Sequence, residues 1–355
     1  MCIRDIYEGT RRKFHGEEQA EPHLKIAYEA ADSVIQSGEH TLYTKGTQPY
    51  KDLFEYTGEE ASEHILVKLY GYQETQLLTH NYPYQIAVNY GVSRNFLNLY
   101  LNDTGLPFED DPSLQLTYND YFDGRDPRLA ETALRRGVNT YQFGPFVPYA
   151  QSRTGFGIRK YVRNDGMTDQ PSTLDYPLLR YAEVLLTYAE ARFEHDGIIS
   201  DEDLNRTVNA LRDRVGMANL ILDDANKTPD PYLSDAKTGY PNVTGANKGV
   251  ILEIRRERTI ELAMEGFRYY DIMRWKEGKT FEQPLLGLYI PSKGEYDLDG
   301  YGTPDIYLKT KGETPSTKAP LIMEIDQDIF LSEGDHGYIS PHKKNPGEWN
   351  DCLLY

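Results

Sequence analysis

Four stretches of this sequence place apolar residues at the spacing of an amphipathic helix, and they constrain the fold more than any other feature. They lie near 20–38, 176–196, 201–216 and 248–277. The recurrence at i, i+3 and i+4 predicts a helix in each, and the fourth is either one long helix or two helices hinged near Gly266. The second and third stretches together approach the roughly 34-residue length of a tetratricopeptide unit. The sequence therefore predicts an all-α fold with a tetratricopeptide-like helical scaffold.

A long segment between the helices lacks any sustained period. Residues 76–175 are dense in Gly, Pro, Asn, Asp and Tyr. The aromatic content argues against disorder, so we expect a loop-rich ligand-binding lobe held by the rigid scaffold. The expected domains are a helical tetratricopeptide-like segment, the loop-rich lobe, a helical scaffold and an irregular C-terminal segment, at 1–75, 76–175, 176–280 and 281–355.

Charge and cysteine content exclude several classes of protein. The 355 residues include 38 Lys+Arg and 56 Asp+Glu, a formal net charge of −18, which repels nucleic acid. Only Cys2 and Cys352 are present, so neither a disulfide framework nor a cysteine zinc site is expected. No apolar run approaches the roughly 18 residues of a membrane helix, and the first residues do not resemble a signal peptide.

Regularly spaced glutamates invite a catalytic interpretation. They are Glu253, Glu257, Glu261 and Glu265 on one side of a helix, with Glu190 and Glu194 as a similar pair. Paired carboxylates are what a glycosidase needs, so an all-α glycoside hydrolase is one alternative. Interleaved arginines lower carboxyl pKa values, however, which is the opposite of what a catalytic acid requires. We therefore expect structural ion pairs, with Glu261 and Glu265 contributing to stability.

One acidic loop resembles the front of a calcium-binding loop. Asp297, Asp299 and Asp305 occupy the first, third and ninth positions, and Gly302 the sixth. The twelfth position is Leu308 instead of a bidentate Glu. Ca²⁺ is therefore one possible ligand, and an Asx-rich turn is the favoured alternative. No other cofactor is expected.

Three motifs resemble the SusD/RagB family of surface glycan-binding lipoproteins. They are YPLLRYAEVLLTYAEA at 176–191, RDPRL at 125–129 and ILEIRRERTIELAMEGFRYYDIMRWKEG at 251–278. The residues of the last motif that carry the resemblance are Arg258, Glu261, Leu262, Glu265, Gly266, Arg268, Asp271, Arg274 and Trp275. The match covers the C-terminal two-thirds of such a protein.

The resemblance implies a non-catalytic protein at the cell surface. Such proteins are lipid-anchored in the outer membrane, bind oligosaccharides and pass them to a TonB-dependent transporter of the SusC type. We expect neither the family's signal peptide nor its acylated cysteine in this sequence, and Cys2 is not expected to be the anchor because no apolar stretch precedes it. The N-terminal third of the family, which contributes to its ligand site, is expected to be missing as well.

We expect the ligand site among the tyrosine-rich loops of the lobe. Sugars present C–H faces to aromatic rings and hydroxyls to planar polar groups. The candidate residues are Tyr82, Tyr84, Asn89, Tyr90, Tyr118, Asn119, Tyr121, Phe146, Tyr149 and Arg153. Several of these rings are expected to fill the core of the lobe instead. A tetratricopeptide adaptor that binds peptides is a further alternative, although it leaves the tyrosine-rich loops unexplained.

Overall fold

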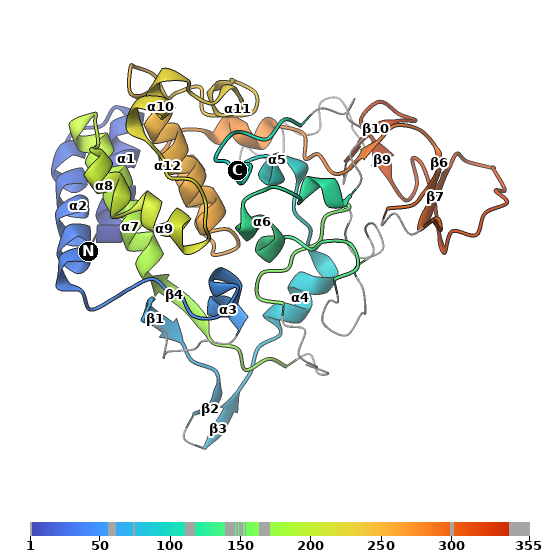
Figure 1. Cartoon of the computed structure of the whole chain (residues 1–355), viewed down its shortest axis with the longest axis horizontal. Helices are drawn as coiled ribbons and strands as arrows, with labels where there is room; N and C mark the ends of the chain where they lie inside the picture. Colours follow the sequence, from blue (N-terminus) through green and yellow to red (C-terminus); the bar gives the residue numbers. More distant parts are fainter. Residues whose placement is uncertain are drawn as a thin grey trace. The chain divides into compact units, whose positions relative to one another are not determined.

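The computed structural model describes two compact units, each assembled from separate segments of the chain (Figure 1). The described residues are 2–55, 62–73, 75–110, 118–138, 146, 148, 152, 154–162, 171–298 and 302–340. The helical unit comprises 1–78, 103–107 and 173–283, and the loop unit comprises 79–102, 108–172 and 284–355. The first and third expected domains thus fall largely in the helical unit, and the second and fourth in the loop unit.

The helical unit is built mainly from α-helices. Its helices are α1 (Cys2–His15), α2 (Ala20–Ser37), α3 (Pro49–Glu55), α7 (Tyr181–Asp196), α8 (Asp201–Asn205), α9 (Val208–Arg214), α10 (Leu222–Lys227), α11 (Pro231–Ser234), α12 (Lys248–Glu261), α13 (Arg268–Arg274) and the 3₁₀ helix η3 (Gly278–Glu282). Helix α7 is buried nearly all round because α1, α2 and α12 pack against it. The central core contains Leu185, Leu211, Val250 and Ile254.

Two of the expected helices differ from the structure. Residues 176–180 form a strand, β4 (Tyr176–Arg180), which pairs antiparallel with β1 (His64–Lys68). The expected helix at 201–216 is split into α8 and α9 at Thr207, whose hydroxyl donates to the Asp203 carbonyl oxygen at 2.6 Å. The spacing of apolar residues predicts neither difference, because strand pairing and side-chain hydrogen bonds to the backbone cause them.

The hinge expected near Gly266 is confirmed. Helix α12 ends at Glu261 and α13 begins at Arg268. Between them Met264 and Gly266 have φ values of 65° and 87°. The left-handed conformation cannot continue a right-handed helix, so the chain turns here. A second small sheet of this unit pairs β2 (Gly71–Gln73) with β3 (Gln76–Leu78).

The loop unit combines short helices with two small sheets. Its helices are α4 (Tyr82–Asn89), α5 (Arg94–Leu97), η2 (Asn119–Tyr121) and α6 (Pro127–Thr132). Its strands are β5 (Tyr289–Ile290), β6 (Gly294–Tyr296), β7 (Ile306–Lys309), β8 (Leu321–Glu324), β9 (Phe330–Leu331) and β10 (Gly337–Ser340). They form sheets ordered β5-β10-β9 and β6-β7-β8. The segment after 281 is therefore less irregular than expected, because strands as short as these leave little alternation to detect.

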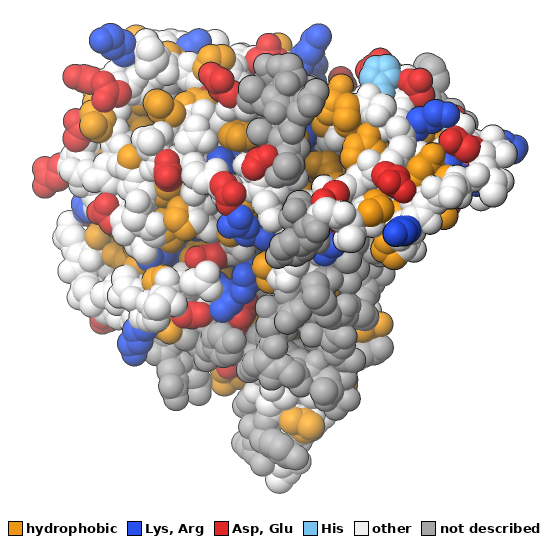
Figure 2. Space-filling view, turned by 45° about the vertical axis from the view of Figure 1, so that its right-hand side comes forward, with side chains coloured by type: hydrophobic (Ala, Val, Ile, Leu, Met, Phe, Trp, Pro, Cys, Tyr) orange, Lys and Arg blue, Asp and Glu red, His pale blue; other side chains and the backbone are white. Residues whose placement is uncertain are grey.

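The visible surface mixes both signs of charge. Figure 2 shows acidic and basic side chains interspersed with small hydrophobic areas on one face of the molecule. Within the part of the chain that the structure describes, no helix has the length and apolar character needed to cross a bilayer.

Candidate functional site

Two of the tyrosines expected to contact ligand lie on one short helix of the loop unit, and a third directly follows it. Helix α4 starts at Tyr82 with Pro83 in its first turn, where proline is well tolerated, and buried Ile86 anchors it. Tyr82 and Tyr84 are half-buried. Tyr90, the residue after the last turn, is 54% exposed. The segment expected to be a loop is therefore a helix that presents aromatic side chains near the surface.

Three other aromatic candidates are buried in the core of the loop unit. The Tyr118 ring stacks on Phe156 at 5.5 Å between ring centres, and its hydroxyl donates to the Leu134 carbonyl oxygen at 2.8 Å. Phe146 is fully buried beside Tyr118. Burial raises the pKa of Tyr121 to about 12, and its hydroxyl accepts a hydrogen bond from Arg94. These rings stabilise the unit from within, as expected for part of the set.

The remaining ligand candidates are Asn89, Asn119, Tyr149 and Arg153. Asn119 begins η2 and is half-buried, and its Oδ1 atom has no hydrogen-bond partner among the described residues. Asn89 is the last residue of α4. Tyr149 and Arg153 lie outside the described residues. Their role in ligand binding stays a prediction.

The regularly spaced glutamates form ion pairs, as expected. Glu261 accepts from Arg180 at 2.7 Å and from Arg214 at 2.6 Å, and Glu265 accepts from Arg180 at 2.7 Å. Arg180 and Arg214 lie on β4 and α9, and Glu265 follows the end of α12. Glu257 pairs with Arg212 at 3.1 Å. These carboxylates are thus held in ion pairs with guanidinium groups.

Glu190 and Glu194, the second pair of carboxylates, have different partners. Both Glu190 oxygens accept from Arg274, and Oε1 also accepts from the Trp275 indole at 2.6 Å. The pKa of Glu190 is lowered, because the attraction of Arg274 outweighs burial, which acts in the opposite direction. Glu194 instead pairs with Lys13 at 2.7 Å and lines a cavity.

In the acidic loop, hydrogen bonds occupy the described carboxylates. Asp297 accepts from the Gly302 amide at 2.7 Å. Asp305 accepts from the Leu298 amide at 2.8 Å and forms an ion pair with Arg136. Asp299 lies outside the described residues, and those residues contain no cluster of three or more potential metal ligands. Calcium binding at Asp297, Asp299 and Asp305 therefore stays a prediction.

Two cavities open on the helical unit. One, of about 320 Å³, lies beside Arg212, Asp224, Asp230 and Glu253. Three of these four side chains are acidic, and Asp230 and Glu253 both pair with Arg256. Arg212 also pairs with Glu253, so Arg212, Asp230 and Glu253 are all engaged in ion pairs.

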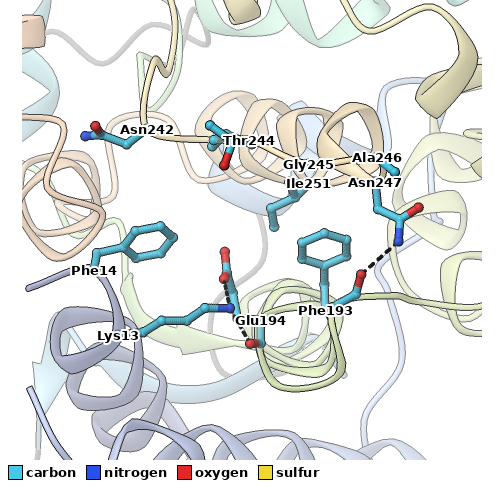
Figure 3. A pocket seen from close by; sticks show the side chains of 12 residues that line it. Lys13, Phe14, Phe193, Glu194, Asn242, Thr244, Gly245, Ala246, Asn247 and Ile251 are labelled. Carbon is cyan, nitrogen blue, oxygen red and sulfur yellow. Dashed lines mark hydrogen bonds and ion pairs between the residues drawn. The ribbon is translucent and has the colours of Figure 1, made fainter. Parts of the chain in front are cut away.

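The other cavity, of about 290 Å³, lies between α1, α7, the 242–247 loop and the start of α12 (Figure 3). The rings of Phe14 and Phe193 project into it from opposite sides, and the Lys13–Glu194 pair lies between them. Sequence reasoning missed this cavity, because three segments that lie far apart in the chain form it, within 13–14, 193–197 and 242–251. The only signal was Glu194, which we noted as one of a carboxylate pair.

A model of the SusD family matches residues 58–328, which is more than half of the chain. The chain belongs to the SusD family. A curated relative, SusD-like protein P2 of Formosa agariphila, is 32% identical over 181 residues, which cover 49% of this chain and 32% of the relative. The family resemblance drawn from the three sequence motifs is thereby confirmed.

Solved SusD-like structures confirm the helical scaffold. A SusD-like carbohydrate binding protein from Bacteroides fragilis is 25% identical with a TM-score of 0.58, covering 92% of this chain and 58% of that chain. A second SusD-like protein from Bacteroides fragilis is 20% identical with a TM-score of 0.58, and the match covers 81% of this chain and 55% of that chain. This chain thus spans less than two thirds of the length of each of these relatives. The tetratricopeptide-like fold is confirmed.

Proposed function

We propose that this protein is a non-catalytic glycan-binding component of the cell surface. The observation that carries the proposal is membership of the SusD family together with similarity to a SusD-like carbohydrate binding protein. In the full-length protein a lipid anchor would hold it at the outer membrane, where it would pass oligosaccharides to a TonB-dependent transporter of the SusC type.

We assign the first contact with glycan to α4. Tyr82, Tyr84 and Tyr90 are the described aromatic candidates that are not fully buried. Aromatic faces attract the C–H groups of a sugar ring, and Tyr hydroxyls add hydrogen bonds. The buried rings of Tyr118, Tyr121 and Phe146 would support this helix from the core instead of touching the ligand.

Calorimetry on the full 355-residue chain with maltoheptaose, laminarihexaose and xylohexaose tests the proposal. We expect at least one of them to bind, and Tyr90→Ala to weaken that binding by about 2- to 10-fold, the value of one aromatic contact. The matched control is Tyr269→Ala, since Tyr269 is 58% exposed on α13 of the helical unit. The assignment of the site fails if Tyr90→Ala and Tyr84→Ala both bind as tightly as the wild type.

The same oligosaccharides separate binding from hydrolysis. We expect no release of reducing ends, because the described glutamates of the family motif are paired with arginines. Release that Glu261→Gln abolishes without unfolding the protein would favour the glycoside hydrolase instead.

A further inference from the structure

The cavity between α1, α7 and α12 has the chemistry of a sugar site. Phe14 and Phe193 present rings to it, and Thr244 and Asn247 lie at its edge, where the Asn247 amide donates to the Gly197 carbonyl oxygen at 2.9 Å (Figure 3). Aromatic faces with a few planar polar groups suit a carbohydrate ring. Because 290 Å³ is near the small end of the roughly 300–1,000 Å³ of ligand sites, the cavity suits a single ring.

The charges of the cavity favour a neutral guest. Lys13 Nζ lies 2.7 Å from Glu194 Oε2 and also donates to the Glu194 carbonyl oxygen. This pair has no net charge, so the residues that line the cavity offer no surplus cation to an anion such as phosphate. The Glu194 carboxylate is a well-positioned hydrogen-bond acceptor for a guest in the cavity, because its side chain is only 4% exposed and is held by Lys13.

Behind the cavity lies a buried guanidinium without hydrogen bonds. Arg255 follows Ile251 by one turn of α12, and its Cζ atom lies 5.0 Å from the centre of the Phe14 ring. Its nearest carboxylate oxygens, on Glu194 and Glu277, are each 3.6 Å away. None of its three nitrogens has a hydrogen-bond partner among the described residues.

Such a group needs a partner, because buried donors left unpaired destabilise the folded state. Arg255 does not line the cavity, but Glu194 does and lies 3.6 Å from Arg255, so a hydroxyl in the cavity can donate to Glu194. The hydroxyls of a sugar offer such a donor. An aliphatic guest does not.

We infer that this cavity is a second saccharide site, which holds one neutral sugar ring between Phe14 and Phe193 with a hydroxyl on Glu194. The inference rests on the proposed glycan-binding function but adds a site on the helical scaffold, separate from α4. A second contact on the same chain would raise the overall affinity for a branched or long glycan whose length spans both sites.

Saturation-transfer NMR on the full chain tests the inference with the methyl glycosides of glucose, galactose, mannose and xylose. We expect at least one to bind saturably. Thr244→Trp at the exposed rim should abolish this binding by filling the cavity, and Phe14→Leu should weaken it about 2- to 10-fold. Thr314→Trp, at an exposed threonine of the loop unit, is the matched control and should leave binding unchanged.

The outcomes separate this inference from the proposed function. Single-ring binding that is lost in Thr244→Trp and retained in Tyr90→Ala supports the second site. Single-ring binding that neither Thr244→Trp nor Phe14→Leu changes overturns it. Absence of single-ring binding while Tyr90→Ala still weakens an oligosaccharide overturns the second site and leaves the proposed function standing. Absence of any saccharide binding overturns both.

Discussion

Buried arginines with carboxylate partners are the main residue-scale feature of the helical unit. Arg180 is 1% exposed and contacts Glu63, Glu261 and Glu265, each at 2.7 Å. Removing charges from water is costly, and only several well-placed partners compensate for it. The family motif therefore marks residues that hold the scaffold together, since each partner depends on the others.

Glu261→Gln should lower the free energy of unfolding by about 3 kcal/mol, because Arg180 and Arg214 would lose a buried charged partner. Denaturation by urea measures the change. Glu29→Gln on the exposed face of α2 is the control and should change stability by less than about 0.5 kcal/mol. A loss below about 1 kcal/mol in Glu261→Gln would contradict the structural role.

Glu183 makes stability depend on pH. Burial raises its pKa from 4.5 to about 7, and its Oε1 atom lies 3.9 Å from Arg258 without a hydrogen-bond partner among the described residues. Between these two pH values the folded state binds more protons than the unfolded state, so the free energy of unfolding decreases as pH rises. This decrease in the free energy of unfolding is complete above about pH 7 and amounts to at most about 3 kcal/mol.

Glu183→Gln should remove that loss, because the amide does not ionise. We expect the variant to melt at a higher temperature than the wild type at pH 8, with the advantage shrinking towards pH 4, where Glu183 is protonated in both states. Calorimetric melting at the two pH values measures this. An advantage that is equal at both values would show that Glu183 does not titrate as proposed.

At the scale of elements, the close approach of α10 and α12 depends on one glycine. Gly249 lies in the first turn of α12, and a Cβ atom there would lie 1.8 Å from the Ala225 carbonyl oxygen of α10. A backbone carbonyl in a helix cannot move aside as the end of a flexible side chain can. The two helices therefore touch only because this position has no side chain.

Gly249→Ala should destabilise the protein by about 2 kcal/mol, since α10 must shift away from α12. Hydrogen exchange of the α10 amides should increase at the same time. Gly278→Ala is the control, because a Cβ atom at Gly278 meets nothing within 4 Å. Wild-type stability in Gly249→Ala would mean that the two helices do not pack this closely.

At the scale of the whole molecule, the chain crosses between its two units several times. Residues 103–107 belong to the helical unit, although the segments on either side belong to the loop unit. The net charge of −18 is a property of the entire sequence, and the expected lack of affinity for nucleic acid follows from it. That expectation, like the membrane anchor and the transporter partner, stays a prediction.

Local patterns determined the scaffold. The helical period predicted α2, all of α7 and the α12–α13 pair, because the apolar residues of each helix lie along one continuous stretch of chain. The turn at Gly266 was also predictable, since glycine adopts a positive φ readily. The motif at 251–278 identified the family for the same reason: its residues are adjacent in the sequence.

Only the tertiary structure decided which residues meet. Residues 176–180 became a strand because β1, more than a hundred positions earlier, supplies its hydrogen bonds. Composition could not separate buried Tyr118 from exposed Tyr90, because burial depends on packing partners such as Phe156 that lie far along the chain. The cavity beside Phe14 was invisible for the same reason. The spacing of apolar residues and the family motif are local properties of the sequence, whereas burial and cavities are created when distant segments pack together.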